Sequence, residues 1–112
     1  MHRPMQVHHR IVREQTTAHG GHEVELRGDG FLLAFGSAPD AIRCAVALQS
    51  AFAKHCREQP TQPLRVRIGL HTGEAIQDED KFFGKTVIQA FRIADLARAG
   101  EILVSSEIKS LV

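Results

Sequence analysis

Apolar residues recur along the chain at helical and at strand spacings, and these spacings predict its elements. Residues His8 to His19 have a helical pattern, and the following Gly20-Gly21 pair is typical of a helix C-terminus. Two apolar-rich runs come next, HEVELR and FLLAF, joined by Gly28-Asp29-Gly30. Because Asp-Gly favours the positive backbone angles of tight turns, this segment predicts a β-hairpin.

A long amphipathic helix is predicted to begin at Ser37. Asp40 stands three positions later as a weak capping-box partner, since the usual Glu or Gln is missing. Apolar side chains then recur at helical spacing, which predicts one buried face. They are Ala38, Ala41, Ala45, Leu48 and Phe52, with Ile42 and Val46 widening the stripe. The segment REQPTQP, residues 57–63, breaks the helix.

The second half of the chain predicts a strand, a loop, a helix, a strand and a final helical turn. In LRVRIGLHTG, residues 64–73, apolar side chains alternate with Arg65, Arg67, Gly69 and His71, which is typical of a strand. QDEDK, residues 77–81, is expected to be a polar loop. An amphipathic helix follows from Gly84 to about Ala99-Gly100, then a short strand, EILVS. Ser105 or Ser106 caps a last turn through Leu111.

This order of elements, α-β-β-α-β-loop-α-β-α, predicts an α+β fold. A hairpin with a helix on each side is the middle of a ferredoxin-like β-α-β-β-α-β unit. The strand that should precede the first helix is missing, although it is central to that sheet. Its absence would leave unpaired backbone groups in the core. We therefore expect residues 1–112 to form one partial domain, either clipped or completed by another strand or subunit.

Composition narrows the class of protein. Hydrophobic residues make up 43% and charged residues 24% of the 112 residues, as in ordinary globular proteins. The formal net charge is only +1, and the lack of a dense basic run argues against nucleic-acid binding. No apolar stretch is long enough to cross a membrane, so a cytoplasmic location is expected.

The cysteine and histidine residues form no recognisable disulfide or metal-binding pattern in the sequence. Cys44 and Cys56 fall in one predicted helix, about 18 Å apart, which is too far for a disulfide, so both thiols should be free. No Cys or acidic cluster accompanies the seven histidines. We expect them to be surface or capping residues rather than metal ligands.

Three blocks of sequence resemble the class III adenylate and guanylate cyclases, in the order of that family. GHEVELRGDGFLLAF is similar to the family's hairpin, with an acidic residue in a "GD" turn. RVRIGLHTGEA resembles the strand and turn after the next helix, and FFGKTVIQAFRIADLARAGEILVSS resembles the family's "FG-TVN-AAR" helix and following strand. The resemblance implies a nucleotide-cyclase-type sheet with helices packed on it.

The resemblance also implies a chemistry and a set of roles. Family members act as head-to-tail dimers that hold ATP or GTP between subunits, with Mg²⁺ or Mn²⁺ bound by two aspartates. Asp29 matches the hairpin metal ligand, which could otherwise be a simple turn residue, and the first-strand aspartate has no counterpart. Arg92 matches the arginine that neutralises phosphate charge, although a surface arginine is the alternative.

Base and ribose recognition depart from the family pattern. Glu25 matches the first base-reading position and alone would favour GTP, because a carboxylate accepts hydrogen bonds from the guanine edge. Lys81 falls at the second base-reading position, and a shift of one residue would place Asp80 there instead. Solvated charges are the alternative for all three. Ile88 stands where the family has the Asn that orients the ribose.

Three functions remain open from the sequence. The first is a degenerate or truncated cyclase domain that makes no cyclic nucleotide alone, and its metal site would be weak and incomplete. The second is a working cyclase subunit, forming a homodimer or a heterodimer with a chain that supplies the absent residues. The third is a non-catalytic interaction domain. The absence of the Asn counts against the second.

Overall fold

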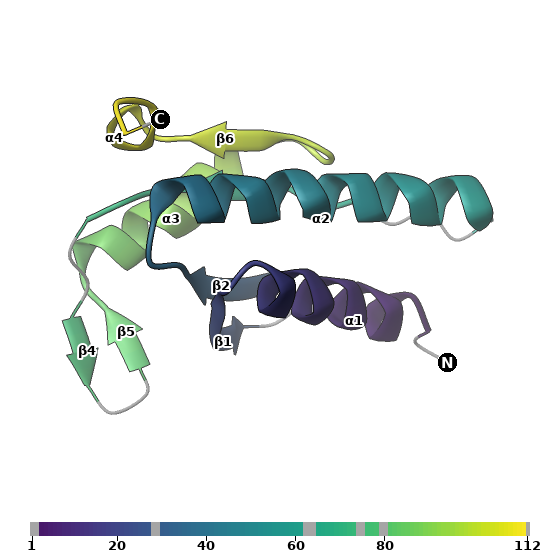
Figure 1. Cartoon of the computed structure of the whole chain (residues 1–112), viewed down its shortest axis with the longest axis horizontal. Coiled ribbons are helices and arrows are strands. Elements are labelled where there is room, and N and C mark those ends of the chain that lie inside the picture. The colour runs from purple at the N-terminus through teal and green to yellow at the C-terminus, as the bar shows by residue number, and fades with distance from the viewer. Residues whose placement is uncertain (1–2, 28–29, 62–64, 74–75, 79–80, 112) are drawn as a thin grey trace.

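The computed structural model of the chain describes residues 3–27, 30–61, 65–73, 76–78 and 81–111. Helices and strands alternate as expected for an α+β domain (Figure 1). The helices are α1 (Arg3–Ala18), α2 (Ala38–Glu58), α3 (Lys85–Leu96) and α4 (Ser106–Lys109). The strands are β1 (His22–Arg27), β2 (Gly30–Ala34), β3 (Ile68–Leu70), β4 (Ile76–Asp78), β5 (Lys81–Phe83) and β6 (Ile102–Val104).

Local signals in the sequence correctly predicted several helix ends. Gly20 has a φ of 71° after α1, and the N–H of Gly21 donates to the carbonyl of Thr16 at 2.8 Å, which closes the helix. Ser37 caps α2, and its hydroxyl accepts a hydrogen bond from the backbone N–H of Asp40. Ser105 caps α4 in the same way through Ile108.

Four boundaries differ from the predictions. α1 begins at Arg3 rather than near His8, β3 is shorter than the alternating run that predicted it, and α3 ends at Leu96. The expected polar loop at 77–81 instead contributes to the antiparallel pair β4–β5, which extends from the body of the domain (Figure 1). Two strands that pair mainly with each other need no buried apolar face, so their pattern carried no strand signal.

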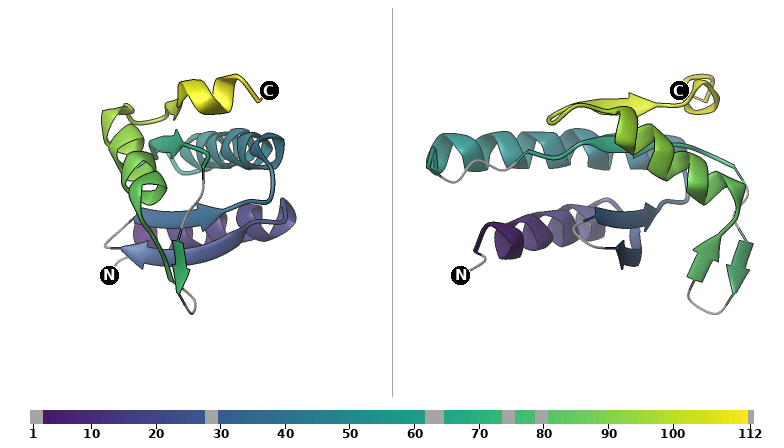
Figure 2. Two further views of the ribbon diagram at one scale, coloured as in Figure 1. Left: turned by 90° about the vertical axis from the view of Figure 1, so that its left-hand side faces the viewer. Right: turned by 180° about the vertical axis from the view of Figure 1, so that it is seen from behind.

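The main core forms between α1, α2 and the strands beside them. Figure 2 shows the two helices on the same side of β1–β2. The buried side chains of this core are Ile11, Val12, Cys44, Leu48 and Phe52. Phe31, Leu33, Phe35, Val66 and Ile68 pack against them but are only partly buried. Ala41, Ala45, Leu48 and Phe52 of the predicted stripe are thus buried, but Val46, which was expected to widen it, is 54% exposed. Burial of this face holds the strands against the helices.

β3 lies between α2 and α3, and a glycine allows the close approach. A Cβ at Gly69 would lie 2.3 Å from the backbone nitrogen of Ala94 in α3. Val66 and Ile68, on the alternate positions, pack toward the α2 core. α3 therefore packs on the face of β3 that carries Gly69, which is the face that Arg67 and His71 share in the alternating run.

The described strands form three separate pairs instead of one sheet. β1 pairs with β2 antiparallel, β3 with β6 parallel, and β4 with β5 antiparallel. β2 and β3 face a common cavity, at the position where a ferredoxin-like sheet would have its first strand. The part of the chain that the structure describes contains no helix long and apolar enough to span a membrane.

Candidate functional site

The β1–β2 hairpin carries the first group of candidate residues. Its strands pair from His22 with Ala34 down to Arg27 with Gly30, so the hairpin is confirmed. Asp29 lies outside the described residues, and its metal role stays a prediction. Glu25 lies on β1 and is partly buried.

A β-bulge decides which way Glu25 faces. Glu23 pairs with Leu33, but Glu25 pairs with Leu32, so Val24 is an extra residue on β1. Residues two apart on a regular strand share a face, whereas a bulge between them puts them on opposite faces. Because Leu33 packs on the core, Glu23 faces the helices and Glu25 faces away from them. The sequence showed no signal for this bulge.

Glu23 is consequently bound by a residue of α1. Arg13 donates to both carboxylate oxygens of Glu23, at 2.8 and 3.2 Å, and its guanidinium lies 5.3 Å from the centre of the Phe31 ring. The hydrogen bond from Arg13 lowers the pKa of Glu23. This pair fixes α1 against the hairpin and was not predicted from the sequence.

The two predicted base-reading positions lie on neighbouring strands. The backbone of Lys81 begins β5, opposite Asp78, and β5 is in contact with β1. The structure thus brings together the strands that carry Glu25 and Lys81, within one chain. β5 then leads through Gly84 (φ 112°) directly into α3, which carries the remaining candidates.

α3 presents Ile88 and Arg92 on one exposed face, one turn apart. Residues four apart lie above one another on a helix, and Ile88 is 52% exposed. Arg92 is also exposed and forms no ion pair with any residue that the structure describes. Val87, on the opposite face, is buried. The helix therefore holds both side chains outward, where a second molecule can reach them.

A complete metal site is not formed by the described residues. Within the described ranges, no three His, Cys, Asp or Glu side chains come together as a possible metal cluster. Asp29 would be one carboxylate ligand, and one carboxylate does not make up the oxygen-rich coordination that Mg²⁺ or Mn²⁺ requires. The described residues alone do not make up a site for a resident metal ion.

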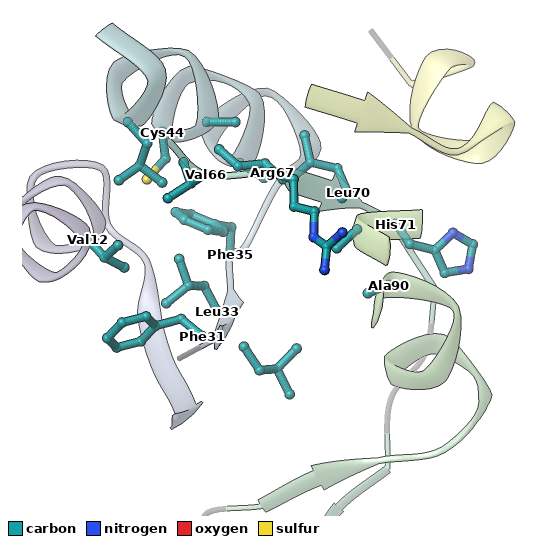
Figure 3. A pocket seen from close by; sticks show the side chains of 18 of the residues that line it. Val12, Phe31, Leu33, Phe35, Cys44, Val66, Arg67, Leu70, His71 and Ala90 are labelled. Carbon is teal, nitrogen blue, oxygen red and sulfur yellow. The ribbon is translucent and has the colours of Figure 1, made fainter. Parts of the chain in front are cut away.

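A cavity of about 540 Å³ lies between β2 and β3, and we call it the β2–β3 groove. Its walls include Phe31 and Leu33 of β2 and Val66 and Ile68 of the β3 segment. Arg67 extends into this space (Figure 3), and its guanidinium lies 3.9 Å from the carboxylate of Asp95 on α3. Arg67 belongs to the polar face of the alternating run, which was the only sequence signal for it.

Comparisons with known proteins agree on one family. The family model for the adenylate and guanylate cyclase catalytic domain matches residues 1–112. An uncharacterized protein of Mycobacterium tuberculosis is 38% identical over 103 residues, which cover 90% of this chain and 33% of that protein. The chain therefore spans about a third of the length of this curated relative.

Solved structures give the same result. An adenylate/guanylate cyclase/hydrolase from Silicibacter pomeroyi matches with a TM-score of 0.84 and 28% identity, covering 90% of this chain and 60% of that one. An adenylate cyclase from Trypanosoma brucei matches with a TM-score of 0.83 and 27% identity, covering 100% and 67%. The fold is thus that of solved cyclase domains, and the chain belongs to the adenylate and guanylate cyclase catalytic domain family.

Proposed function

We propose that this chain is a class III nucleotide cyclase domain that makes no cyclic nucleotide by itself. The observation that carries the proposal is Ile88, which occupies the position of the family's ribose-orienting Asn and is exposed on α3. An aliphatic side chain neither donates nor accepts a hydrogen bond, so it cannot orient a ribose hydroxyl. Misplacing the attacking oxygen by about 1 Å can reduce a rate by about a hundredfold.

Arg92 retains a role in this proposal. Its exposed guanidinium, one turn after Ile88, has the donor geometry that suits a phosphate oxygen. In the described part of the chain no carboxylate neutralises it. A domain with Arg92 but without the Asn should therefore attract the phosphates of ATP or GTP more effectively than it positions the sugar.

Base preference is proposed to be weak. Glu25 faces away from the core, and the strand carrying Lys81 lies beside it. A carboxylate matches the donors of guanine, whereas the lysine at the second base-reading position departs from the family pattern for either base. We expect the chain to distinguish GTP from ATP poorly, and Glu25→Gln to change that ratio.

Turnover by the purified chain tests the proposal directly. The chain is incubated with ATP or GTP and Mn²⁺, and cyclic product is measured alongside Ile88→Asn. We expect no product from the unmodified chain. Robust formation of cyclic AMP or cyclic GMP by this chain alone would overturn the proposal. Calorimetric titration with both nucleotides tests binding separately, and no binding at all would favour a non-catalytic interaction domain.

A second candidate is a working subunit that completes its site with another cyclase chain. The exposed, unneutralised position of Arg92 favours it, because such a side chain is available to a site shared between two chains. The test is co-purification with an intact cyclase domain, followed by activity measurements with Arg92→Ala. Arg43→Ala is the matched control, since Arg43 is an exposed arginine on α2 whose ion pair among the described residues is with Asp40, three positions earlier. Equal activity of the two variants would reject this candidate.

A further inference from the structure

Arg92 and Asp95, both in the described part of the chain, lie three positions apart on α3 and form no ion pair with each other. Side chains at this spacing are neighbours on a helix surface, where opposite charges commonly pair. The carboxylate of Asp95 lies instead 3.9 Å from the guanidinium of Arg67, on the segment that leads into β3. Asp95 is therefore directed toward the strand and not along its own helix.

The register between β3 and α3 explains this direction. An added Cβ would lie 2.3 Å from the backbone nitrogen of Ala94 at Gly69, and 2.8 Å from the hydroxyl oxygen of Thr86 at Gly73. The strand segment therefore runs antiparallel to α3. Four extended residues span about 13 Å and eight helical residues about 12 Å, so the two contacts agree in spacing. Both contacts fix α3 against this segment.

The position of Asp95 on the helix places it between two arginines. Consecutive helical residues are rotated by about 100° around the axis. Asp95 is thus about 100° from Ala94, which approaches the strand, whereas Arg92 is about 160° from Ala94. Arg67 lies two residues before Gly69 and shares its face of the strand, toward α3. Arg67 can reach the carboxylate of Asp95 from the strand, and Arg92 can reach it along the helix.

Charge decides what this arrangement does for Arg92. A carboxylate paired with Arg92 would occupy donors that a phosphate oxygen would otherwise take, and would offset the positive charge. Arg67 supplies a second positive charge to the same carboxylate. The side chains of Arg67 and Asp95 are 55% and 75% exposed, and Arg92 is exposed as well. The competition is therefore between solvated groups, and its effect is small but measurable.

We propose that Arg67 is a positioning residue for phosphate binding: it holds the carboxylate of Asp95 toward the β3 segment and leaves the guanidinium of Arg92 available to the triphosphate of ATP or GTP. The inference rests on the phosphate role proposed above for Arg92 and adds two residues to it. Arg67 acts through Asp95 and does not itself contact the nucleotide.

Inorganic triphosphate is the probe, because it carries the charged group of both nucleotides without base or ribose. Its affinity for the full chain is measured by calorimetry at low salt. Arg67→Ala should weaken binding about two- to fivefold, which is the range that one exposed ion pair supports. Arg67→Lys should retain most of the affinity. Arg65→Ala, which removes a neighbouring exposed arginine, should change the affinity less than Arg67→Ala does.

The decisive comparison repeats Arg67→Ala in a chain that carries Asp95→Asn. If Arg67 acts through Asp95, its removal should leave the triphosphate affinity of this second chain unchanged. Equal weakening in both chains would refute the proposal, because Arg67 would then contact the phosphate itself or support the fold.

Two further measurements separate this inference from the role of Arg92. Arg92→Ala should remove most of the triphosphate binding, and if it does not, or if the unmodified chain binds no triphosphate, the phosphate role of Arg92 fails and this inference with it. Without any ligand, the NMR signal of the Arg92 side-chain Nε–H should shift on Arg67→Ala, but not when Asp95→Asn is also present. An unchanged signal would overturn the inference and leave the role of Arg92 intact.

Discussion

Replacing Gly69 by Ala should disrupt the packing of α3 on β3. The added Cβ would lie 2.3 Å from the backbone nitrogen of Ala94, 2.7 Å from its Cα and 2.8 Å from the carbonyl carbon of Ile93. All three atoms belong to the helix backbone, so no side-chain rotation relieves the clash. Since ordinary contacts begin at 3.4 Å, α3 must move away by about 1 Å.

The expected cost follows from this displacement. Overpacking that shifts a backbone typically costs about 1–3 kcal/mol. Against a total stability of about 5–15 kcal/mol for a domain of this kind, that loss is substantial. With a urea m-value of about 2 kcal/mol/M, a loss of about 2 kcal/mol lowers the unfolding midpoint by about 1 M. The displacement also moves Arg92, which the same helix carries.

Urea unfolding followed by circular dichroism measures this difference. The matched control is Gly36→Ala, because a Cβ at Gly36 would meet no heavy atom within 4 Å and its φ is not positive. Gly36→Ala should leave the midpoint unchanged or raise it, through the lower entropy of the unfolded chain. Equal midpoints for the two variants would refute the close packing of α3 on β3.

Three further predictions concern the core and the α1–hairpin contact. Changing Phe52, which is 2% exposed, to Ala should lower the free energy of unfolding by about 3–5 kcal/mol in the same unfolding assay. Cys56 should react with a thiol reagent in the native chain, whereas Cys44 should react only on unfolding, because burial raises the pKa of its thiol and blocks access. Glu23 has a lowered pKa in the folded chain, chiefly through its hydrogen bond from Arg13. Its ionised carboxylate therefore stabilises the folded chain fully above its ordinary pKa of about 4.3, and this stabilisation is lost as the pH falls through the lowered value. The free energy of unfolding should therefore fall more steeply from pH 6 to pH 3 for the native chain than for Glu23→Gln. Parallel curves of this free energy against pH would contradict the prediction.

Local signals were sufficient to predict much of the fold. The helical stripe of α2, its cap at Ser37 and the hairpin around Gly28-Asp29-Gly30 were each visible in a short window of sequence. Ser105 was likewise one of two expected caps for the last helical turn. Caps and turns depend on contacts within about four residues, so a single sequence contains the information they need.

The candidate site was only partly predictable. The positions of Glu25, Lys81 and Arg92 came from family-like motifs, and the motifs did not say which residues would face one another. The bulge at Val24 reverses Glu25 relative to Glu23, and most of β4 and the start of β5 lie where a polar loop was expected. Both features arise from pairing with another strand, which a hydrophobic pattern does not report.

By itself, the sequence determined the helices and strands of this chain apart from β4 and β5, the ends of several helices, and that an aliphatic residue stands at position 88 where the family has a polar one. Only the tertiary structure decided that β3 pairs with β6, that α3 approaches β3 through Gly69, and that a groove separates β2 from β3. The reason is distance along the chain. Propensity and capping act between near neighbours, whereas strand pairing and packing join residues tens of positions apart, and many such pairings satisfy the same local pattern.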